Sequence, residues 1–174
     1  HAHLFGADDL GRDTLSRILV AARLEIEIAL LAVLTAAAVG VPIGLIAGYA
    51  GGWCDRIIVF LIDTVLSLPA ILLAMTLVGI WGAGVLNIGI SIGVVSFPLF
   101  ARLTRASTLS LKFLPFVEAA RVLGASDVRI MASHILPNAL SPLIVQGSLL
   151  MGFAILSESG LSFLGLGIAP PEPS

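Results

Sequence analysis

The sequence predicts an all-α protein that crosses a membrane several times, and its composition and the spacing of its charges support this. Of its 174 residues, 58% are hydrophobic and only 11% are charged, whereas a soluble domain has roughly 25% charged residues. Residues 28–54, 64–101 and 130–157 contain no Asp, Glu, Lys or Arg. A helix needs about 20 apolar residues to cross the hydrocarbon layer. Each of the three stretches is therefore long enough to span a membrane.

The charge balance excludes nucleic acid as a partner. The formal net charge is −2, and Lys112 is the only lysine, so the chain offers no basic field that could hold a phosphate backbone. Cys54 is the only cysteine, and no disulfide can form within the chain.

The charge-free stretches predict four spans, near residues 28–51, 57–79, 85–103 and 139–157. Residues 64–101 would extend about 57 Å as one helix, which is too long for one crossing. We therefore expect a break within residues 79–87, where glycines are frequent. Each span contains one proline, which membrane helices tolerate because neighbouring groups satisfy the freed carbonyls, so kinked helices are expected: Pro42, Pro69, Pro98 and Pro142.

The first span carries small residues at every fourth position, which allows another helix backbone to approach closely. The alternative is that glycine is merely common in membrane helices. The stripe consists of Ala32, Ala36, Gly40, Gly44, Gly48 and Gly52.

Residues 1–27 are expected to form an extracytoplasmic, interfacial segment. Within it, residues 8–27 predict an amphipathic helix that lies along the membrane surface. The acidic residues near its start could suggest a cation site, but they lack the spacing of a calcium loop. Capping of the helix start by Asp13 is the favoured interpretation.

The distribution of cations predicts which side of the membrane each part faces. Arg12, Arg17 and Arg23 precede the first span, and the larger group lies on the other side: Arg56, Arg102, Arg105, Lys112, Arg121 and Arg129. The positive-inside rule then places residues 104–138 in the cytoplasm and both chain ends outside it. Because the chain starts at His1 without a hydrophobic signal, we expect sequence to be missing at its beginning and, after Pro170–Ser174, also at its end.

The cytoplasmic loop predicts a short helix, a turn and a second helix. Residues 116–123 favour a helix that Gly124 ends, and Ser126 can cap the next one. Pro137 is expected to separate this segment from the last span. The small side chains of Ala119 and Ala120 beside Glu118 would suit insertion into a groove of another protein. The equally weighted alternative is a solvated loop in which Glu118 pairs with Arg121.

Asp63 and Glu158 lie near membrane depth, where burial of a charge is costly, so each is a candidate for the transport pathway or for a structural role. Asp63 is expected to pair with Arg56 or to reach the cytoplasmic surface, rather than to contact a substrate. Glu158 is expected to reach the outer water. His134 has no Cys or His companion nearby and is a poor candidate for a metal ligand, so no metal site is predicted.

Glu118-Ala119-Ala120, Gly124 and the run from His134 to Asn138 have the spacing of a known loop. The sequence resembles the "EAA" loop of ABC importer permeases. Residues 6–13, 161–167 and Pro170-Pro171 extend the resemblance to the second permease subunit of the dipeptide, oligopeptide and nickel importers. His134 stands where many importers have isoleucine, which fits the peptide and nickel branch.

This resemblance implies a type I ABC importer transmembrane domain in a bacterial inner membrane, with a further helix before and after the present chain. It implies a coupling helix that docks on an ATP-hydrolysing subunit, and the implied contact residues are Glu118, Ala119, Ala120, Arg121, Gly124, Ala125 and Asp127. The implied partners are a second permease subunit, two ABC ATPase subunits and an extracytoplasmic substrate-binding protein.

No Gly-x-x-x-x-Gly-Lys-Ser/Thr motif occurs in the sequence, so we expect ATP and Mg²⁺ to be bound by the partner subunits and no cofactor or catalytic residue on this chain. The cargo could be a peptide, nickel or a related small solute. The main alternative is an ion-coupled secondary transporter, which would need ionisable relays and usually an internal repeat. A serine protease built from Ser157, Ser159 and His134 is disfavoured, because His134 is expected at the opposite membrane face.

Overall fold

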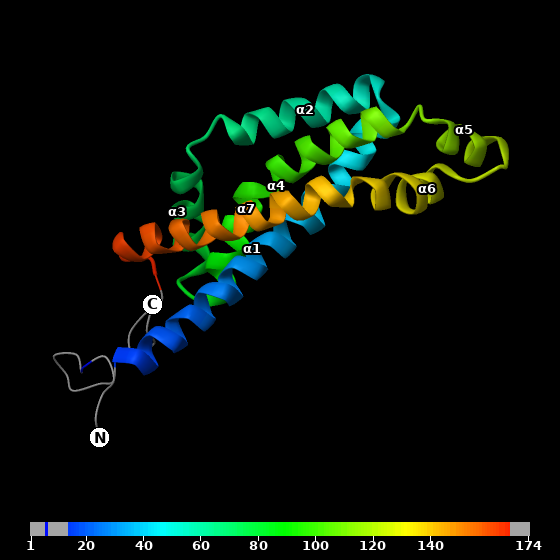
Figure 1. Cartoon of the computed structure of the whole chain (residues 1–174). Coiled ribbons are helices and arrows are strands. Elements are labelled where there is room, and N and C mark those ends of the chain that lie inside the picture. Colours follow the sequence, from blue (N-terminus) through cyan, green and yellow to red (C-terminus); the bar gives the residue numbers. More distant parts are fainter. Residues whose placement is uncertain (1–5, 7–13, 168–174) are drawn as a thin grey trace.

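The computed structural model describes residue 6 and residues 14–167, and every regular element in these residues is helical. Long helices lie side by side in an elongated bundle, and a small helical loop projects from one end (Figure 1). We call this the loop end. The elements in chain order are α1 (Thr14–Ala50), α2 (Gly52–Leu66), α3 (Ala70–Trp81), α4 (Val85–Leu111), α5 (Pro115–Val122), α6 (Asp127–Ile130), the π-helix η1 (Met131–Ile135) and α7 (Leu136–Phe163).

Helix α1 is one continuous helix of 37 residues, about 55 Å long at 1.5 Å per residue. It passes through Pro42 and includes residues 14–27. The separate surface helix expected over residues 8–27 is therefore wrong in its later part, and residues 8–13 lie outside the described residues. The physical reason is that no Gly or Pro separates the amphipathic segment from the apolar one, so the helix continues.

The span expected at residues 57–79 is divided into two helices. Helices α2 and α3 meet at an angle of 86°, and Pro69 is the N-cap of α3. Proline lacks a backbone donor and forces the residue before it away from helical geometry. The predicted kink is thus a complete break. At the other end of α2, Gly51 and Gly52 have positive φ angles of 65° and 58°, and they turn the chain sharply away from α1.

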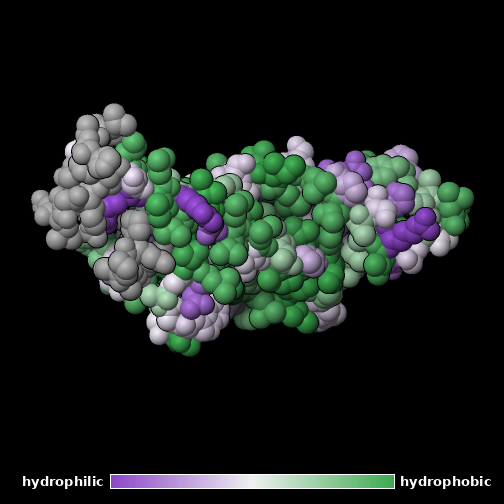
Figure 2. Space-filling view, turned by 90° about the horizontal axis from the view of Figure 1, so that it is seen from below, coloured by the Kyte–Doolittle hydropathy of each residue, from purple (hydrophilic) through white to green (hydrophobic). Residues whose placement is uncertain are grey.

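Three helices are long and apolar enough to cross a membrane, and the bent pair α2 and α3 can supply a fourth crossing. The three are Thr14–Ala50, Val85–Leu111 and Asp127–Phe163. The predicted all-α membrane fold is confirmed. The space-filling view shows hydrophobic surface over the middle of the molecule and hydrophilic residues towards both ends, including the loop end (Figure 2).

The core consists of three hydrophobic clusters along the bundle. One surrounds Ile28 and Ile92, the next Phe100 and Leu143, and the third, beneath the loop, Leu45. Helix α1 contributes to all three clusters. It is the central element against which α4, α7 and the loop pack.

Candidate functional site

The projecting loop consists of helix α5, a tight turn and helix α6. Pro115 begins α5, where a missing N–H costs nothing. Gly124 has a φ of 83°, the left-handed conformation that ends helices. The Ser126 hydroxyl accepts a hydrogen bond of 3.4 Å from the Arg129 N–H and caps α6. The predicted helix, turn and capped second helix are confirmed.

The loop has an inner face and an outer face. Val117 and Ala120 of α5 are buried against Ile130 and Leu45. Glu118, Ala119, Arg121, Gly124 and Asp127 are exposed, and Ala125 is half-buried. The expectation that both alanines form an exposed surface is therefore wrong for Ala120, because it lies one turn after the buried Val117, on the side that meets the bundle. Only Ala119 is presented with Glu118.

The tip of the loop exposes large apolar side chains. Val122 is 87% exposed, Leu123 86% and Val128 71%. They lie on either side of the Gly124 turn, beyond the last buried residue of α5. Sequence reasoning missed them, although their signal was present: they are apolar residues on either side of the predicted turn at Gly124. An apolar tip flanked by charges is typical of a surface that docks on a partner.

Tyr49, near the end of α1, joins the loop to the membrane helices. Its hydroxyl donates a hydrogen bond of 2.7 Å to Asp127 Oδ1 and accepts one of 3.3 Å from Arg121 Nη2. The Arg121 guanidinium also lies 5.9 Å from the Tyr49 ring centroid. The hydrogen bond to Tyr49 raises the pKa of the Arg121 guanidinium above its ordinary value. Arg121 therefore binds Tyr49 instead of the Glu118 partner that the solvated-loop alternative required.

The loop also continues directly into the last long helix. Helix α6, the π-helical turn η1 and α7 follow one another without a break, from Asp127 to Phe163. Pro137 stands in the first turn of α7, and the wider π-helical turn precedes it. The expectation that Pro137 separates the loop from the last span is wrong, because the π-helical turn accommodates the proline and the helix goes on.

Helices α1 and α4 run parallel and almost touch along a seam of glycines. A Cβ atom added to Gly40, Gly44 or Gly48 would lie 2.7 Å from the Cβ of Phe100, Thr104 or Thr108, respectively. Glycines of α4 fit the other half of α1: a Cβ on Gly89 would lie 2.7 Å from that of Leu31, and one on Gly93 would lie 2.6 Å from that of Thr35. Such distances do not occur between real Cβ atoms.

The predicted small-residue stripe thus lies in the interface between α1 and α4 as far as Gly48. Gly52 does not continue it, because α1 ends at Ala50 and a Cβ on Gly52 would meet nothing within 4 Å. The glycines of α4 were not singled out from the sequence. Their signal was the same four-residue spacing, from Gly89 to Gly93.

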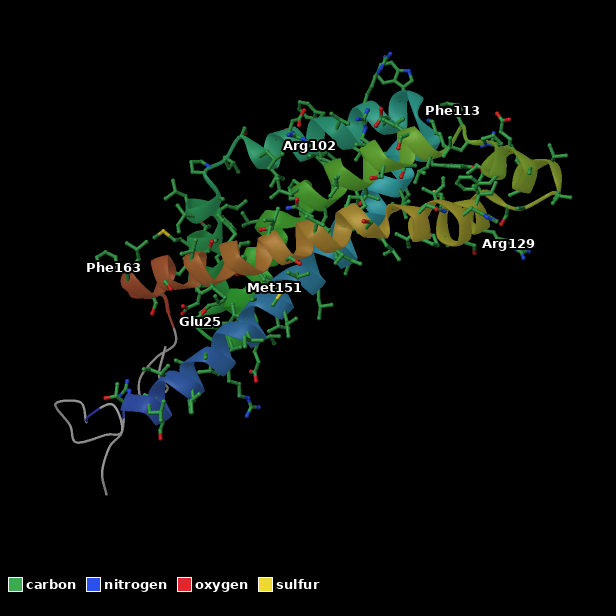
Figure 3. The ribbon with its side chains drawn as sticks, in the orientation of Figure 1. Glu25, Arg102, Phe113, Arg129, Met151 and Phe163 are labelled. Carbon is green, nitrogen blue, oxygen red and sulfur yellow. The ribbon has the colours of Figure 1, made fainter. Side chains whose placement is uncertain are left out.

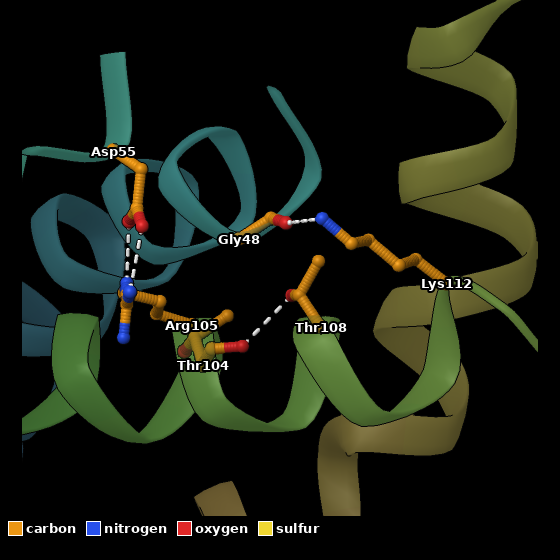
Figure 4. A network of polar contacts seen from close by, with 6 residues as sticks. All are labelled: Gly48, Asp55, Thr104, Arg105, Thr108 and Lys112. Atoms are coloured by element: carbon orange, nitrogen blue, oxygen red, sulfur yellow. Dashed lines mark hydrogen bonds and ion pairs between the residues drawn. The ribbon is translucent and has the colours of Figure 1, made fainter. Parts of the chain in front are cut away.

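Polar contacts attach α2 and the end of α1 to α4 (Figure 4). Arg105 Nε and Nη2 donate to the two Asp55 oxygens at 2.5 and 2.6 Å, and both side chains are largely buried. Lys112 Nζ donates to the Gly48 carbonyl at 2.8 Å. A second ion pair, at 2.6 Å, joins Arg102 to Asp63 and is more exposed. Asp63 is paired as expected, but with Arg102 and not with Arg56, which instead stacks on Trp53.

Glu158 does not reach the outer water. Only 1% of it is exposed, and its side chain lies beside that of Glu25 on α1. Sequence reasoning did not single out Glu25 as its neighbour. The two residues stand about 130 positions apart and become neighbours only because α1 and α7 pack together.

The residues of the disfavoured serine protease do not meet. The hydroxyls of Ser157 and Ser159 donate to backbone carbonyls within α7, whereas His134 lies at the loop end, more than about 30 Å away along the helix. Within the described residues, no group of three or more His, Cys, Asp or Glu could hold a metal ion.

Comparison with known proteins decides the family. Residues 40–174 match the family described as "Binding-protein-dependent transport system inner membrane component". The chain belongs to this family.

Similar members of the binding-protein-dependent transport family include permease proteins of peptide transport systems. The chain is 44% identical to a glutathione transport system permease protein of Pectobacterium atrosepticum, with 99% of the chain and 57% of that protein covered. It is 46% identical to the corresponding protein of Escherichia coli O6:K15:H31, covering 98% and 56%. A dipeptide transport system permease protein of Alkalihalophilus pseudofirmus is 45% identical, again over 98% and 56%.

The family membership confirms the resemblance found in the sequence, the type I ABC importer permease fold and the bacterial inner membrane as the location. The chain spans a little over half the length of these curated relatives. The match from residue 40 includes the whole loop and the glycine seam from Gly40 onward.

Proposed function

We propose that this chain is part of a permease subunit of an ATP-driven importer for small peptides. The relatives named as glutathione and dipeptide permeases support this cargo class. The subunit would work with a second permease subunit, two ABC ATPase subunits that bind ATP and Mg²⁺, and an extracytoplasmic substrate-binding protein. This chain would perform no catalysis.

The observation that carries the proposal is the exposed tip of the loop. Glu118, Val122 and Leu123 project from one end of the bundle, beyond the broad apolar surface of the long helices. Apolar side chains with a flanking charge fit a groove on a folded partner better than they fit water or lipid. An ATPase subunit in the cytoplasm is the partner that the family membership favours.

Two connections would carry movement of the tip to the membrane helices. One is the continuous helix from Asp127 to Phe163, which begins with α6. A displacement of α6 would therefore be transmitted along this helix into α7. The other is Tyr49, which binds both Asp127 and Arg121 and belongs to α1. Because the glycine seam packs α1 tightly on α4, a displacement of α1 also displaces α4. ATP-driven closure of the ATPase subunits would thus switch the bundle between inward-open and outward-open arrangements.

The test is a substitution at the tip of the complete subunit, expressed with its neighbouring transporter genes. Leu123→Asp is expected to abolish co-purification of the ATPase subunits and to stop peptide uptake, because it places a charge in the apolar contact. Leu123→Met keeps the apolar character and serves as the matched control.

Normal ATPase binding and uptake in Leu123→Asp would contradict the proposal. Uptake that follows an ion gradient and needs no ATPase subunit would instead favour a secondary transporter. A second variant, Glu118→Lys, changes only an exposed side chain on α5 and should also weaken ATPase binding without unfolding the bundle.

A further inference from the structure

Two carboxyl groups meet inside the bundle at the end opposite the loop. Glu25 lies on α1, towards the end where α7 finishes at Phe163 and away from Phe113 and Arg129 (Figure 3). Its side chain lies beside that of Glu158 on α7, where the two helices share one hydrophobic cluster. Only 1% of the surface of Glu158 is exposed. Neither residue takes part in the coupling to ATP hydrolysis proposed above.

A proton would satisfy the two carboxyl groups. Glu25 Oε2 and Glu158 Oε1 are buried and have no hydrogen-bond partner within the described residues. An ionised carboxylate has only acceptor oxygens, so two ionised carboxylates form no hydrogen bond with each other. One protonated carboxyl group supplies the missing donor and removes the repulsion between two like charges.

The surroundings of the pair are apolar. Glu158 lies between Ala154 and Leu161 of α7, and Glu25 lies one turn before Ile28 and Ala29, all of which belong to one hydrophobic cluster. A buried carboxylate in such surroundings is costly unless a cation or a proton accompanies it.

No described cation is placed to neutralise the pair. Helices α3 and α7, which share the surrounding hydrophobic cluster, carry no Lys, Arg or His, and the first cation of α4 is Arg102, which pairs with Asp63. On α1, Arg23 pairs with Glu27 at the surface, at 2.9 Å. Arg17 lies two turns before Glu25, about 12 Å along the helix.

We propose that Glu25 and Glu158 form a proton-binding site that fastens α1 to α7 at the end opposite the loop. One proton held between the two carboxyl groups closes the contact. Its loss leaves two like charges in an apolar environment, and the ends of α1 and α7 move apart. The site is a property of this chain's own helices and holds whether or not the importer function is correct.

The first experiment detects the proton. The complete subunit in lipid nanodiscs is studied by infrared spectroscopy, in which a protonated carboxyl group has a C=O band that a carboxylate lacks. We expect a buried carboxylic band at neutral pH that disappears in both Glu158→Gln and Glu25→Gln. Glu27→Gln, at an exposed ion pair on the same helix, is the control and should keep the band. Persistence of the band in both pair variants would overturn the proposal.

The second experiment measures the movement. Spin labels at Leu19 on α1 and Leu156 on α7, which are 64% and 73% exposed, are introduced with Cys54 replaced by serine. The distance between the labels should increase from acidic to alkaline pH in the otherwise unchanged subunit. It should stay constant in Glu158→Gln, because the amide can donate a hydrogen bond to Glu25 and the like-charge repulsion is absent.

A distance that does not change with pH in the unchanged subunit would contradict the proposal. The proposal would also be contradicted if the label distance changed with pH in Glu158→Gln as much as it does in the unchanged subunit. Glu25→Gln repeats the test at a half-buried position, so that a folding defect of one variant cannot decide the result.

Discussion

Tyr49 and Asp127 are 78 residues apart in the chain, and the Tyr49 hydroxyl donates a 2.7 Å hydrogen bond to the Asp127 carboxylate. Tyr49 lies near the end of α1, and Asp127 begins α6, which continues into α7. The contact makes the base of the loop a junction between two long helices, so the position of the tip is linked to both.

Replacing Tyr49 by phenylalanine should loosen this junction. The ring remains, but the hydrogen bonds to Asp127 and Arg121 are lost, which costs about 0.5–1.5 kcal/mol for a typical hydrogen bond. Hydrogen exchange of the amides of residues 115–130 should become faster, while exchange in α3 is unchanged. Ser159→Ala, which removes a hydroxyl bonded within its own helix, is the control. Unaltered exchange in the loop of Tyr49→Phe would mean that the hydroxyl does not hold it.

The glycine seam predicts a sharp difference between two Gly→Ala substitutions. Gly44→Ala should destabilise the full-length subunit by about 1–3 kcal/mol, because its Cβ would overpack the interface. Gly152 of α7 has open space around it, and Gly152→Ala should be neutral or should stabilise by up to about 1 kcal/mol. Thermal unfolding in detergent measures both. Equal effects of the two substitutions would refute the close approach of α1 and α4.

The two ion pairs between α2 and α4 should contribute unequally. Asp63→Asn removes a contact whose side chains are 54% and 59% exposed, and exposed pairs are worth at most about 1 kcal/mol. Asp55→Asn leaves the Arg105 guanidinium largely buried and incompletely paired, which should cost about 1–3 kcal/mol. Thermal unfolding at low and high salt separates the two cases, since salt weakens mainly the exposed pair. A larger loss for Asp63→Asn would reverse this ranking.

The continuous helix from the loop into α7 can be tested by softening it. Glycine at both Ala132 and Ser133, within η1, lowers helix stability by about 1 kcal/mol per residue. Peptide uptake should fall while the ATPase subunits still co-purify, because the tip is untouched but the rod transmits less motion. Ala106→Gly on α4, also exposed, is the matched control. Full uptake in the double variant would show that α6 and α7 need no rigid connection.

The sequence predicted the features that depend on local spacing. Charge-free lengths located the long helices, and the positions of Gly124 and Ser126 determined the turn and cap of the loop, because these are short-range backbone effects. The stripe of glycines on α1 was recognised from its period, but its partner on α4 was not, since period alone does not say which helix packs on which.

The errors concern effects that tertiary contacts decide. Pro69 interrupts the chain between α2 and α3, whereas Pro42 lies within the continuous helix α1. Both prolines were predicted to produce kinks. Glu158 was expected in water and is buried because Glu25, from a distant part of the chain, contacts it. Tyr49 was not noticed, because a single tyrosine near the end of a span reads as an ordinary interfacial residue.

The most direct test asks which side of the membrane the loop tip faces. Single cysteines are introduced at Leu123 in the projecting loop and at Phe163 at the end of α7, which are 86% and 90% exposed and belong to opposite ends of the bundle, with Cys54 replaced by serine. A membrane-impermeant maleimide should modify Leu123→Cys in inverted membrane vesicles, and less when the ATPase subunits are bound. Phe163→Cys should be modified only in spheroplasts. Modification of Leu123→Cys from the outside would contradict the proposed cytoplasmic position of the loop, because a cytoplasmic ATPase subunit could then not bind it.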